Sequence, residues 1–214
     1  MNTDVFEIMR TMRSMRRLKP DPVPTELIRQ ILEAGTVAPP AGNMVGWRFL
    51  VILDQSIKDD IADRYRRAWH CSVGPWFRNG GPEDGAPAAG PSRDRYERML
   101  RAADYLADHL HEAPVWIVPC LLGKAPNWES GSAIYPAVQN MLLAARALGL
   151  GATLTTLYQS CVEDADATLG VPDGAKSFAL LPIGYPLGNF GPVARSALED
   201  VVFVDRWGVK WAGA

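Results

Sequence analysis

The chain has 214 residues, a length that suits one domain of ordinary size and leaves little room for a second. An apolar fraction of 48% against 21% charged residues can bury a full core, which excludes global disorder. The formal net charge is −2, without the positive excess that non-specific binding to nucleic acid requires. We therefore expect no nucleic-acid partner.

Three features predict a cytoplasmic protein that does not enter a membrane. The longest apolar stretches, Phe49–Leu53 and Val115–Leu122, fall well short of the ~20 residues that cross a bilayer, and the first ten residues lack the pattern of a signal peptide. The cysteines, Cys71, Cys120 and Cys161, are too widely spaced for a disulfide framework or a metal motif. This cysteine usage fits a reducing compartment.

Hydrophobic periodicity and capping residues predict the elements of the first part of the chain. We expect a helix over residues 4–13, a second from Thr25 to the stop at Pro39, a strand over Trp47–Leu53 and a helix from Ser56 to near Trp69. Residues 72–91 are dense in Gly and Pro, which favours an irregular loop. We expect this loop to act as a mobile lid on the substrate side.

The second part of the chain again mixes helices and strands. We expect a helix opening at Ser92, a strand over Val115–Leu122, a helix over Ser132–Leu148, a short strand over Ala152–Leu157, a helix near Val162–Leu169 and a strand over Phe178–Tyr185. The tail beyond Gly191 holds too much apolar surface to leave in water, and must be covered. Pairing at the edge of its own sheet is one way to cover it.

The usual self-contained active sites are absent from the sequence. It has no Gly-x-Ser-x-Gly elbow, no phosphate loop and no His-Glu-x-x-His helix. His109 and His111 lie two residues apart on a predicted helix and face different directions, so no metal site is expected. Gly149-Leu150-Gly151 ends a helix and reads better as a helix stop than as a dinucleotide fingerprint. An enzyme with this sequence needs a bound organic cofactor and no catalytic side chain.

Two segments have compositions suited to a ligand. Arg13, Ser14, Arg16, Arg17 and Lys19 concentrate donors that bind phosphate well, although a solvated basic helix end is the reading that composition alone favours. The small residues of Ala38-Pro39-Pro40-Ala41-Gly42-Asn43 allow close approach to a flat ligand, or form a plain turn between helix and strand.

Four segments, in this order and spacing, make the sequence resemble the nitroreductase family of flavin enzymes. They are Arg13–Pro20 with Pro22-Val23-Pro24, Ala38–Asn43 with Trp47-Arg48-Phe49, Ala144–Gly151, and Leu180–Pro186. Each segment is loose by itself, but the four together are specific and cover nearly the whole chain outside residues 72–91.

The resemblance implies one α+β domain over residues 1–214, with a central mixed, mainly antiparallel sheet surrounded by helices. It implies an intertwined homodimer in which residues 198–214 form an arm that wraps the partner subunit. Two FMN molecules per dimer would then lie where the chains meet.

The resemblance also implies roles for particular residues. The FMN phosphate and ribityl chain would be held by Arg13, Ser14, Arg16 and Arg195. The partner protomer would line the flavin with Pro39, Pro40, Ala41 and Asn43. A loop that covers one flavin face, with a backbone N–H at N5, would be formed by Leu154, Thr155, Thr156 and Leu157.

Three positions depart from the family pattern. Met12 stands where the family often has an arginine, Val45-Gly46 replaces a Gln-Pro pair, and Val193 replaces a basic residue. These departures predict weaker flavin binding, unless Arg17 or Lys19 compensates.

The implied reaction is a ping-pong transfer of hydride from NADH or NADPH through FMN to a small acceptor, such as a nitroaromatic or a quinone. Candidate pocket walls are Trp69, Trp76, Phe77, Tyr96 and Trp128, although core packing is the commoner role for each. Two alternatives remain: a relative that uses reduced flavin for dehalogenation or flavin fragmentation, and a flavin-storing protein without turnover.

Overall fold

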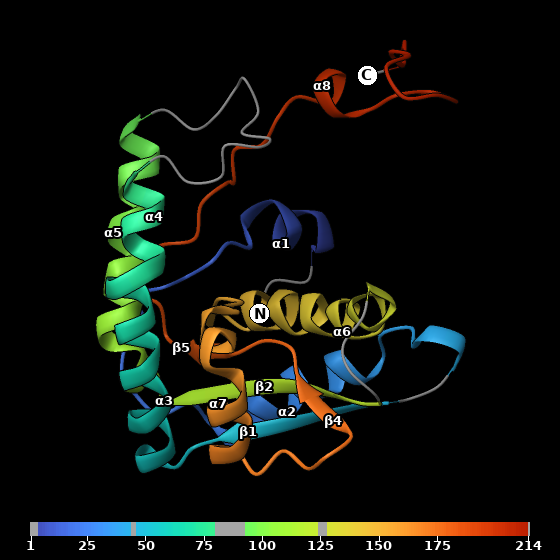
Figure 1. Cartoon of the computed structure of the whole chain (residues 1–214). Coiled ribbons are helices and arrows are strands. Elements are labelled where there is room, and N and C mark those ends of the chain that lie inside the picture. Colours follow the sequence, from blue (N-terminus) through green and yellow to red (C-terminus); the bar gives the residue numbers. More distant parts are fainter. Residues whose placement is uncertain (1–3, 44–45, 80–92, 124–127, 214) are drawn as a thin grey trace.

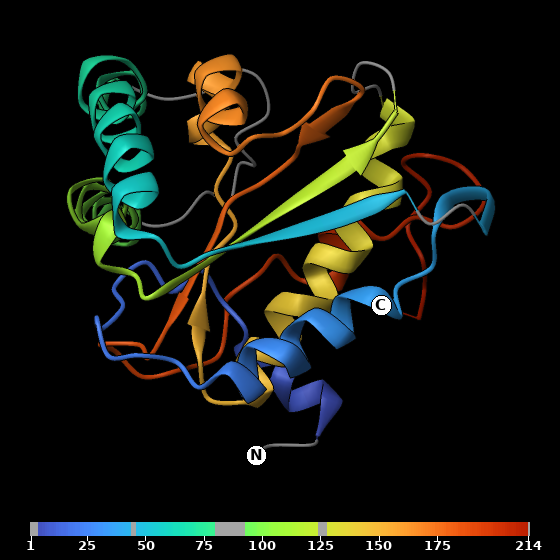
Figure 2. The same cartoon turned by 90° about the horizontal axis from the view of Figure 1, so that it is seen from below.

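The computed structural model of the chain describes residues 4–43, 46–79, 93–123 and 128–213. A single five-stranded sheet lies at the centre, with helices packed on both of its faces (Figures 1 and 2). The strands are β1 (Trp47–Ile52), β2 (Val115–Leu122), β3 (Gly151–Ala152), β4 (Ala175–Ser177) and β5 (Leu181–Gly184). All four described strand pairings are antiparallel, in the order β1-β2-β5-β3 with β4 also on β2. The mainly antiparallel sheet expected of the fold is confirmed.

Helical segments make up most of the remaining structure. The α-helices are α1 (Val5–Thr11), α2 (Thr25–Thr36), α3 (Gln55–Ala68), α4 (Gly74–Arg78), α5 (Arg93–His109), α6 (Trp128–Ala147), α7 (Val162–Thr168) and α8 (Leu198–Val201). Short 3-10 segments cover Ala41–Asn43, Leu110–Glu112 and Leu157–Cys161. Within the described ranges, no helix is both long and apolar enough to span a bilayer.

The alternation of side chains along β2 divides the interior into two cores. Trp116 and Val118 pack with α3 and α5 on one face, whereas Val115 and Ile117 pack with α2 and α6 on the other. Because both faces are covered, β2 is an almost continuous apolar run. This burial fixes the register of the sheet, since a slip by one residue would exchange the two faces.

A proline in β2 interrupts the ladder next to the last predicted strand. Pro119 has no N–H to donate, and the ladder on β2 is broken there between β5, which pairs with Val115–Ile117, and β4, which pairs with Cys120–Leu122. The expectation of one strand over Phe178–Tyr185 is therefore wrong, because β4 precedes that range and β5 occupies only part of it.

Two other boundaries also differ from expectation. The third helix starts at Gln55 instead of Ser56, because the carboxylate of Asp54 accepts bonds from the backbone N–H groups of Ser56 and Ile57. The short strand expected over Ala152–Leu157 ends at Ala152, and beyond it Thr155 makes only an isolated bridge with Leu180.

The helix that begins at Gln55 continues to Arg78 through a five-residue π-helical segment, Trp69–Val73. The irregular loop expected over residues 72–91 is therefore wrong for residues 72–78. Gly74 and Pro75 suggested a loop, yet Pro is tolerated in a first helical turn, and a Cβ on Gly74 would meet the Trp69 carbonyl at 2.9 Å. The remaining residues of that range, apart from Asn79, lie outside the described residues, and with them the proposed lid.

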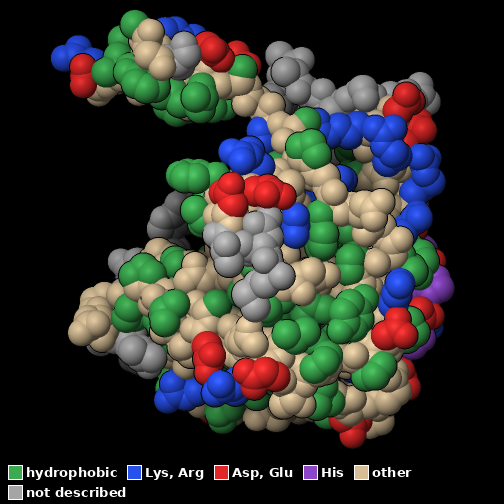
Figure 3. Space-filling model, turned by 180° about the vertical axis from the view of Figure 1, so that it is seen from behind, with side chains coloured by type: hydrophobic (Ala, Val, Ile, Leu, Met, Phe, Trp, Pro, Cys, Tyr) green, Lys and Arg blue, Asp and Glu red, His purple; other side chains and the backbone are tan. Residues whose placement is uncertain are grey.

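The C-terminal tail stands clear of the body of the molecule (Figures 1 and 3). Its described hydrogen bonds stay within residues 197–213, and its one bridge joins Phe203 to Lys210. Trp207 is 91% exposed, and Val201 and Trp211 are exposed as well. In the single chain the described tail therefore does not pair with the edge of its own sheet.

Candidate functional site

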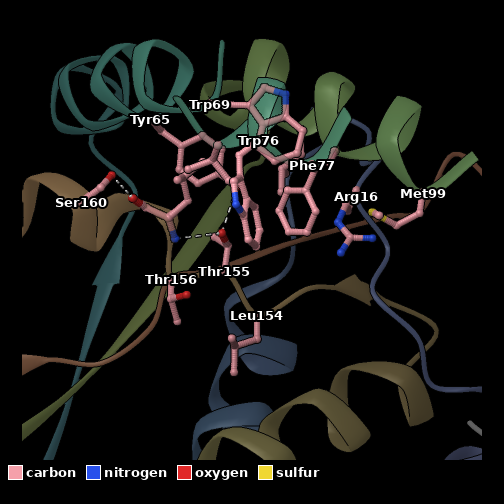
Figure 4. A pocket seen from close by; sticks show the side chains of 14 residues that line it. Arg16, Tyr65, Trp69, Trp76, Phe77, Met99, Leu154, Thr155, Thr156 and Ser160 are labelled. Carbon is pink, nitrogen blue, oxygen red and sulfur yellow. Dashed lines mark hydrogen bonds between the residues drawn. The ribbon is translucent and has the colours of Figure 1, made fainter. Parts of the chain in front are cut away.

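A pocket of about 510 Å³ lies between the long helix α3–α4, helix α5 and the loop that follows β3 (Figure 4). We call it the aromatic pocket, because four aromatic rings make up much of its wall: Tyr65, Trp69, Trp76 and Phe77. Arg16 and Met99 lie at one side, and the loop Leu154–Leu157 lies opposite the rings. A volume of this size and an apolar wall suit a small planar ligand.

Polar contacts with α5 hold the aromatic wall in place. The Trp69 indole N–H donates to the Asp104 carboxylate at 2.8 Å, and the same oxygen pairs with Arg78. The Tyr96 hydroxyl donates to the Phe77 carbonyl at 2.7 Å. Tyr96 thus supports the wall without lining the pocket. Three other predicted wall residues, Trp69, Trp76 and Phe77, line the pocket directly. The side chain of Trp128 lies outside the described residues.

The loop after β3 is tied both to the sheet and to α3. Thr155 exchanges two backbone hydrogen bonds with Leu180, at 3.0 and 2.9 Å, and its hydroxyl lies 2.9 Å from the Tyr65 hydroxyl. Burial raises the pKa of Tyr65, while the hydrogen bond with Thr155 and the charge of Arg16 act against this shift. Tyr65 is therefore a neutral hydrogen-bonding group at neutral pH.

A second hollow, of about 580 Å³, adjoins the aromatic pocket. We call it the arginine hollow, because five arginines line it: Arg13, Arg16, Arg95, Arg98 and Arg195. Ser14 adds a hydroxyl, and Arg16 and Met99 line both cavities. The two cavities therefore adjoin at Arg16 and Met99, one with an aromatic lining and the other with a cationic one.

Three segments that are far apart in the sequence meet at the arginine hollow. The loop after α1 is anchored by the buried Met15, whose N–H donates to the Ala152 carbonyl at 2.9 Å. The segment before the tail is held by the N–H of Val193, which donates to the Arg10 carbonyl at 3.0 Å, and by the Arg95 side chain, which donates to the Ala194 carbonyl at 2.7 Å. These contacts bring α5 and the N- and C-terminal regions together.

Within the described part of the chain, the charge of the arginine hollow is not neutralised by ion pairs. No carboxylate there forms an ion pair with any of the five arginines. Burial lowers the pKa of Arg16, with Tyr65 opposing the shift and the like charge of Arg13 adding to it. Because an arginine stays charged in a protein, this hollow is a strong candidate for binding an anion.

The structure brings together one group of the predicted site residues. Arg13, Ser14, Arg16 and Arg195 line the arginine hollow, and Leu154–Leu157 line the aromatic pocket. Arg17 lies outside the arginine hollow, with its guanidinium over the ring of Tyr105 at 5.2 Å, so within one chain it is not placed to replace the missing donors. Lys19 does not line the hollow either.

The predicted residues of the segment 39–43 do not join this site within one chain. Pro39, Pro40, Ala41 and Asn43 lie between α2 and β1, on the side of the molecule away from α3 and α5 (Figures 1 and 2). Gly42 and Asn43 both have a φ of 58°, which bends the chain tightly at this point.

Arg95 and Arg98 also line the arginine hollow, and the sequence did not predict them. Val193 itself lines the arginine hollow without contributing charge. A spacing of three residues places Arg95 and Arg98 on one face of α5, and this was the available signal. Among the described residues, no three His, Cys, Asp or Glu side chains are grouped so that they can hold a metal ion.

With this fold and site in view, comparisons with known proteins identify the class. The model of the Nitroreductase family matches residues 9–185. The chain therefore belongs to the nitroreductase family. A Thermus thermophilus protein named NADH dehydrogenase is 29% identical over 203 residues, which cover 89% of this chain and 90% of that protein.

Solved structures share the fold at lower identity. An iodotyrosine deiodinase bound to FMN and 3-iodo-L-tyrosine has a TM-score of 0.73 and 21% identity, over 95% of this chain and 100% of the other. A Desulfitobacterium hafniense nitroreductase with bound FMN has a TM-score of 0.68 and 20% identity, over 96% of this chain and 100% of the other.

Proposed function

We propose that this protein is an FMN-dependent oxidoreductase that takes electrons from NADH or NADPH and passes them to a small planar acceptor, such as a nitroaromatic or a quinone. The observation that carries the proposal is that the arginine hollow and the aromatic pocket adjoin, with Arg16 in the lining of both. The family match and the FMN named in the two solved relatives support it.

The donor set of the arginine hollow fits the phosphate of FMN. Arg13, Arg16 and Arg195 supply guanidinium groups, which bind phosphate oxygens in pairs, and Ser14 supplies a hydroxyl donor. Desolvation of Arg16 increases the benefit of an anionic partner, because the low local dielectric strengthens the attraction. We assign these four residues to the phosphate end of the cofactor.

The aromatic pocket fits flat rings and supplies the orientation. Bound FMN would carry the hydride chemistry, and the protein contributes binding, position and exclusion of water. Trp76 and Phe77 form an apolar wall for a planar acceptor, and their rings pack edge to face with centroids 4.8 Å apart. The loop Leu154–Leu157 would lie against the flavin opposite this wall.

The segment 39–43 enters the proposal through a second copy of the chain. Because this segment lies away from the site in its own chain, it contributes to a flavin site only from a partner subunit. We therefore propose a homodimer in which Pro39, Pro40, Ala41 and Asn43 complete the site of the other protomer.

The decisive experiment is an anaerobic titration of the purified, FMN-loaded protein with NADH and with NADPH, followed by the flavin absorbance band. The proposal predicts bleaching by at least one nucleotide, and recovery of the band on addition of a nitroaromatic or a quinone. A yellow protein that neither nucleotide bleaches would instead be a flavin-storing protein.

A second candidate is supported by the fold shared with the iodotyrosine deiodinase. Adding 3-iodo-L-tyrosine to the reduced protein tests it, because release of iodide with recovery of the flavin band would identify reductive dehalogenation. Formation of a flavin breakdown product would identify fragmentation instead.

A further inference from the structure

The arginine hollow carries more positive charge than one phosphate requires. Five guanidinium groups line it, whereas a phosphate monoester has a charge of about −2 at neutral pH. If the FMN phosphate uses the donors proposed above, the arginines on α5 remain available for a second anion. This step rests on the proposed function.

Arg95 and Arg98 are placed to act as a pair. They lie one helical turn apart on α5, are both exposed, and line the same hollow. Arg95 spends one N–H on the Ala194 carbonyl, which fixes the direction of its side chain and leaves other donors available. In the view from behind, basic side chains gather along this edge of the molecule (Figure 3).

The arginine pair lies next to the aromatic pocket along α5. Met99 follows Arg98 on α5 and lines both cavities, so a ligand with its ring in the aromatic pocket and a charged arm past Met99 reaches the pair. After the cofactor phosphate is neutralised, roughly three positive charges remain, more than a single carboxylate balances. A pyrophosphate fits this surplus better.

We propose that Arg95 and Arg98 bind the phosphoryl groups of the pyridine dinucleotide whose nicotinamide ring enters the aromatic pocket. The pair would thus set the affinity for NADH or NADPH, separately from the affinity for FMN. Neither residue takes part in the transfer of hydride.

The test is the double variant Arg95→Gln/Arg98→Gln in the FMN-loaded protein. We expect the KM for NADH and NADPH to rise about tenfold or more, because two charge-assisted contacts are lost. The dissociation constant of NADP⁺, measured by calorimetry on the oxidised holoprotein, should rise by a similar factor. The dissociation constant of FMN should stay within about twofold of the wild type.

Two controls separate dinucleotide binding from other effects. The donor 1-benzyl-1,4-dihydronicotinamide has the reactive ring but no phosphate, so its kcat/KM should be the same in the variant and the wild type. Arg101→Gln is the matched variant on the same helix, because Arg101 lies by Glu97 and lines a different hollow. It should leave all of these constants unchanged.

Four outcomes would overturn the proposal. Weaker FMN binding in the double variant would assign the pair to the cofactor phosphate, and an equal loss with the benzyl donor would place the effect on folding or on hydride transfer. If the dinucleotides reduce the wild type and the double variant has an unchanged KM for both, this inference is rejected and the proposed function stands. A wild type that none of the three donors reduces would reject the proposed function and this inference together.

Discussion

Among the described residues, Arg16 is the one arginine that lines both the aromatic pocket and the arginine hollow. Replacing it with alanine should weaken FMN binding by about 1.5–3 kcal/mol, or roughly tenfold to a hundredfold, because a charge-assisted contact is lost. Fluorescence titration of the apoprotein with FMN measures this change. Arg17→Ala is the neighbouring control, since Arg17 lies over Tyr105 outside the hollow. Equal affinity in Arg16→Ala and the wild type would contradict the assignment.

The cysteines differ in their expected reactivity. Burial raises the pKa of Cys120 to about 12, with a further contribution from the charge of Asp166, whereas Cys71 is exposed. Because the thiolate is the reactive form, iodoacetamide at neutral pH should modify Cys71 and spare Cys120 in the folded protein. Mass spectrometry of the Cys161→Ser variant should therefore show one added group, and two after unfolding. Modification of Cys120 in the native state would indicate local opening of the core.

Composition alone suggested site residues only where they lie in one short segment, whereas Arg195 and the loop Leu154–Leu157 came from the family resemblance. Arg13, Ser14 and Arg16 lie close together before a proline-rich stretch, and their composition suggested a phosphate site. Arg95 and Arg98 were not predicted, because some 80 residues separate them from that segment and only the packing of α5 brings them to it. Periodicity along a helix reveals its faces but does not show what each face meets.

At the scale of elements, the start of α3 depends on one carboxylate. Asp54 accepts hydrogen bonds from the N–H groups of Ser56 and Ile57 and from the Ser56 hydroxyl, and these lower its pKa, with the Ser56 hydroxyl bond the largest cause. A carboxyl whose pKa is lower in the folded than in the unfolded protein stabilises the fold when the pH is above its unfolded pKa. This contribution is lost as the pH falls through the folded pKa.

Asp54→Ala should therefore unfold at a lower urea concentration than the wild type at pH 7, and this difference should shrink as the pH falls below the usual range of an aspartate. Asp54→Asn keeps an acceptor for the backbone N–H groups without the charge. It should retain most of the stability at pH 7 and show less dependence on pH. A difference for Asp54→Ala that stays constant down to pH 2.5 would show that the charge contributes nothing.

Long elements were predicted well, and short ones were not. Helices such as α2 and α6 and the strand β2 have apolar patterns strong enough to be read locally. The boundaries of β3, β4 and β5 depend on which backbone groups face them across the sheet, as the break at Pro119 shows. Such partners are not encoded in the short strand itself.

At the scale of the whole molecule, the tail is a segment whose apolar side chains are exposed to solvent. Its exposed apolar side chains have no cover in the single chain, which agrees with the proposed arm on a partner subunit. Removing residues 198–214 should give a chain that fails to dimerise, binds little FMN and aggregates. Light scattering gives the mass, and the ratio of flavin to protein absorbance gives the cofactor content.

The substitution Trp207→Ser with Trp211→Ser keeps the full length and removes only the exposed rings of the tail. This double substitution should weaken the dimer less than the truncation does. The FMN content should fall in proportion to the loss of dimer. A truncated protein that remains a stable yellow dimer would show that the subunits associate through another surface.

The π-helical segment Trp69–Val73 has a consequence for how this pocket can change. Each residue added to or removed from a helix turns everything beyond it by about 100°. Trp76 and Phe77 face the aromatic pocket because the wide turn precedes them, and Gly74 allows that turn to close onto the Trp69 carbonyl. Loss of one residue from the segment would restore an ordinary helix and rotate both rings away from the pocket. A change in the length of this segment therefore reshapes the pocket without any substitution of the side chains that line it. Related sequences that differ in length here would bind acceptors of different shapes.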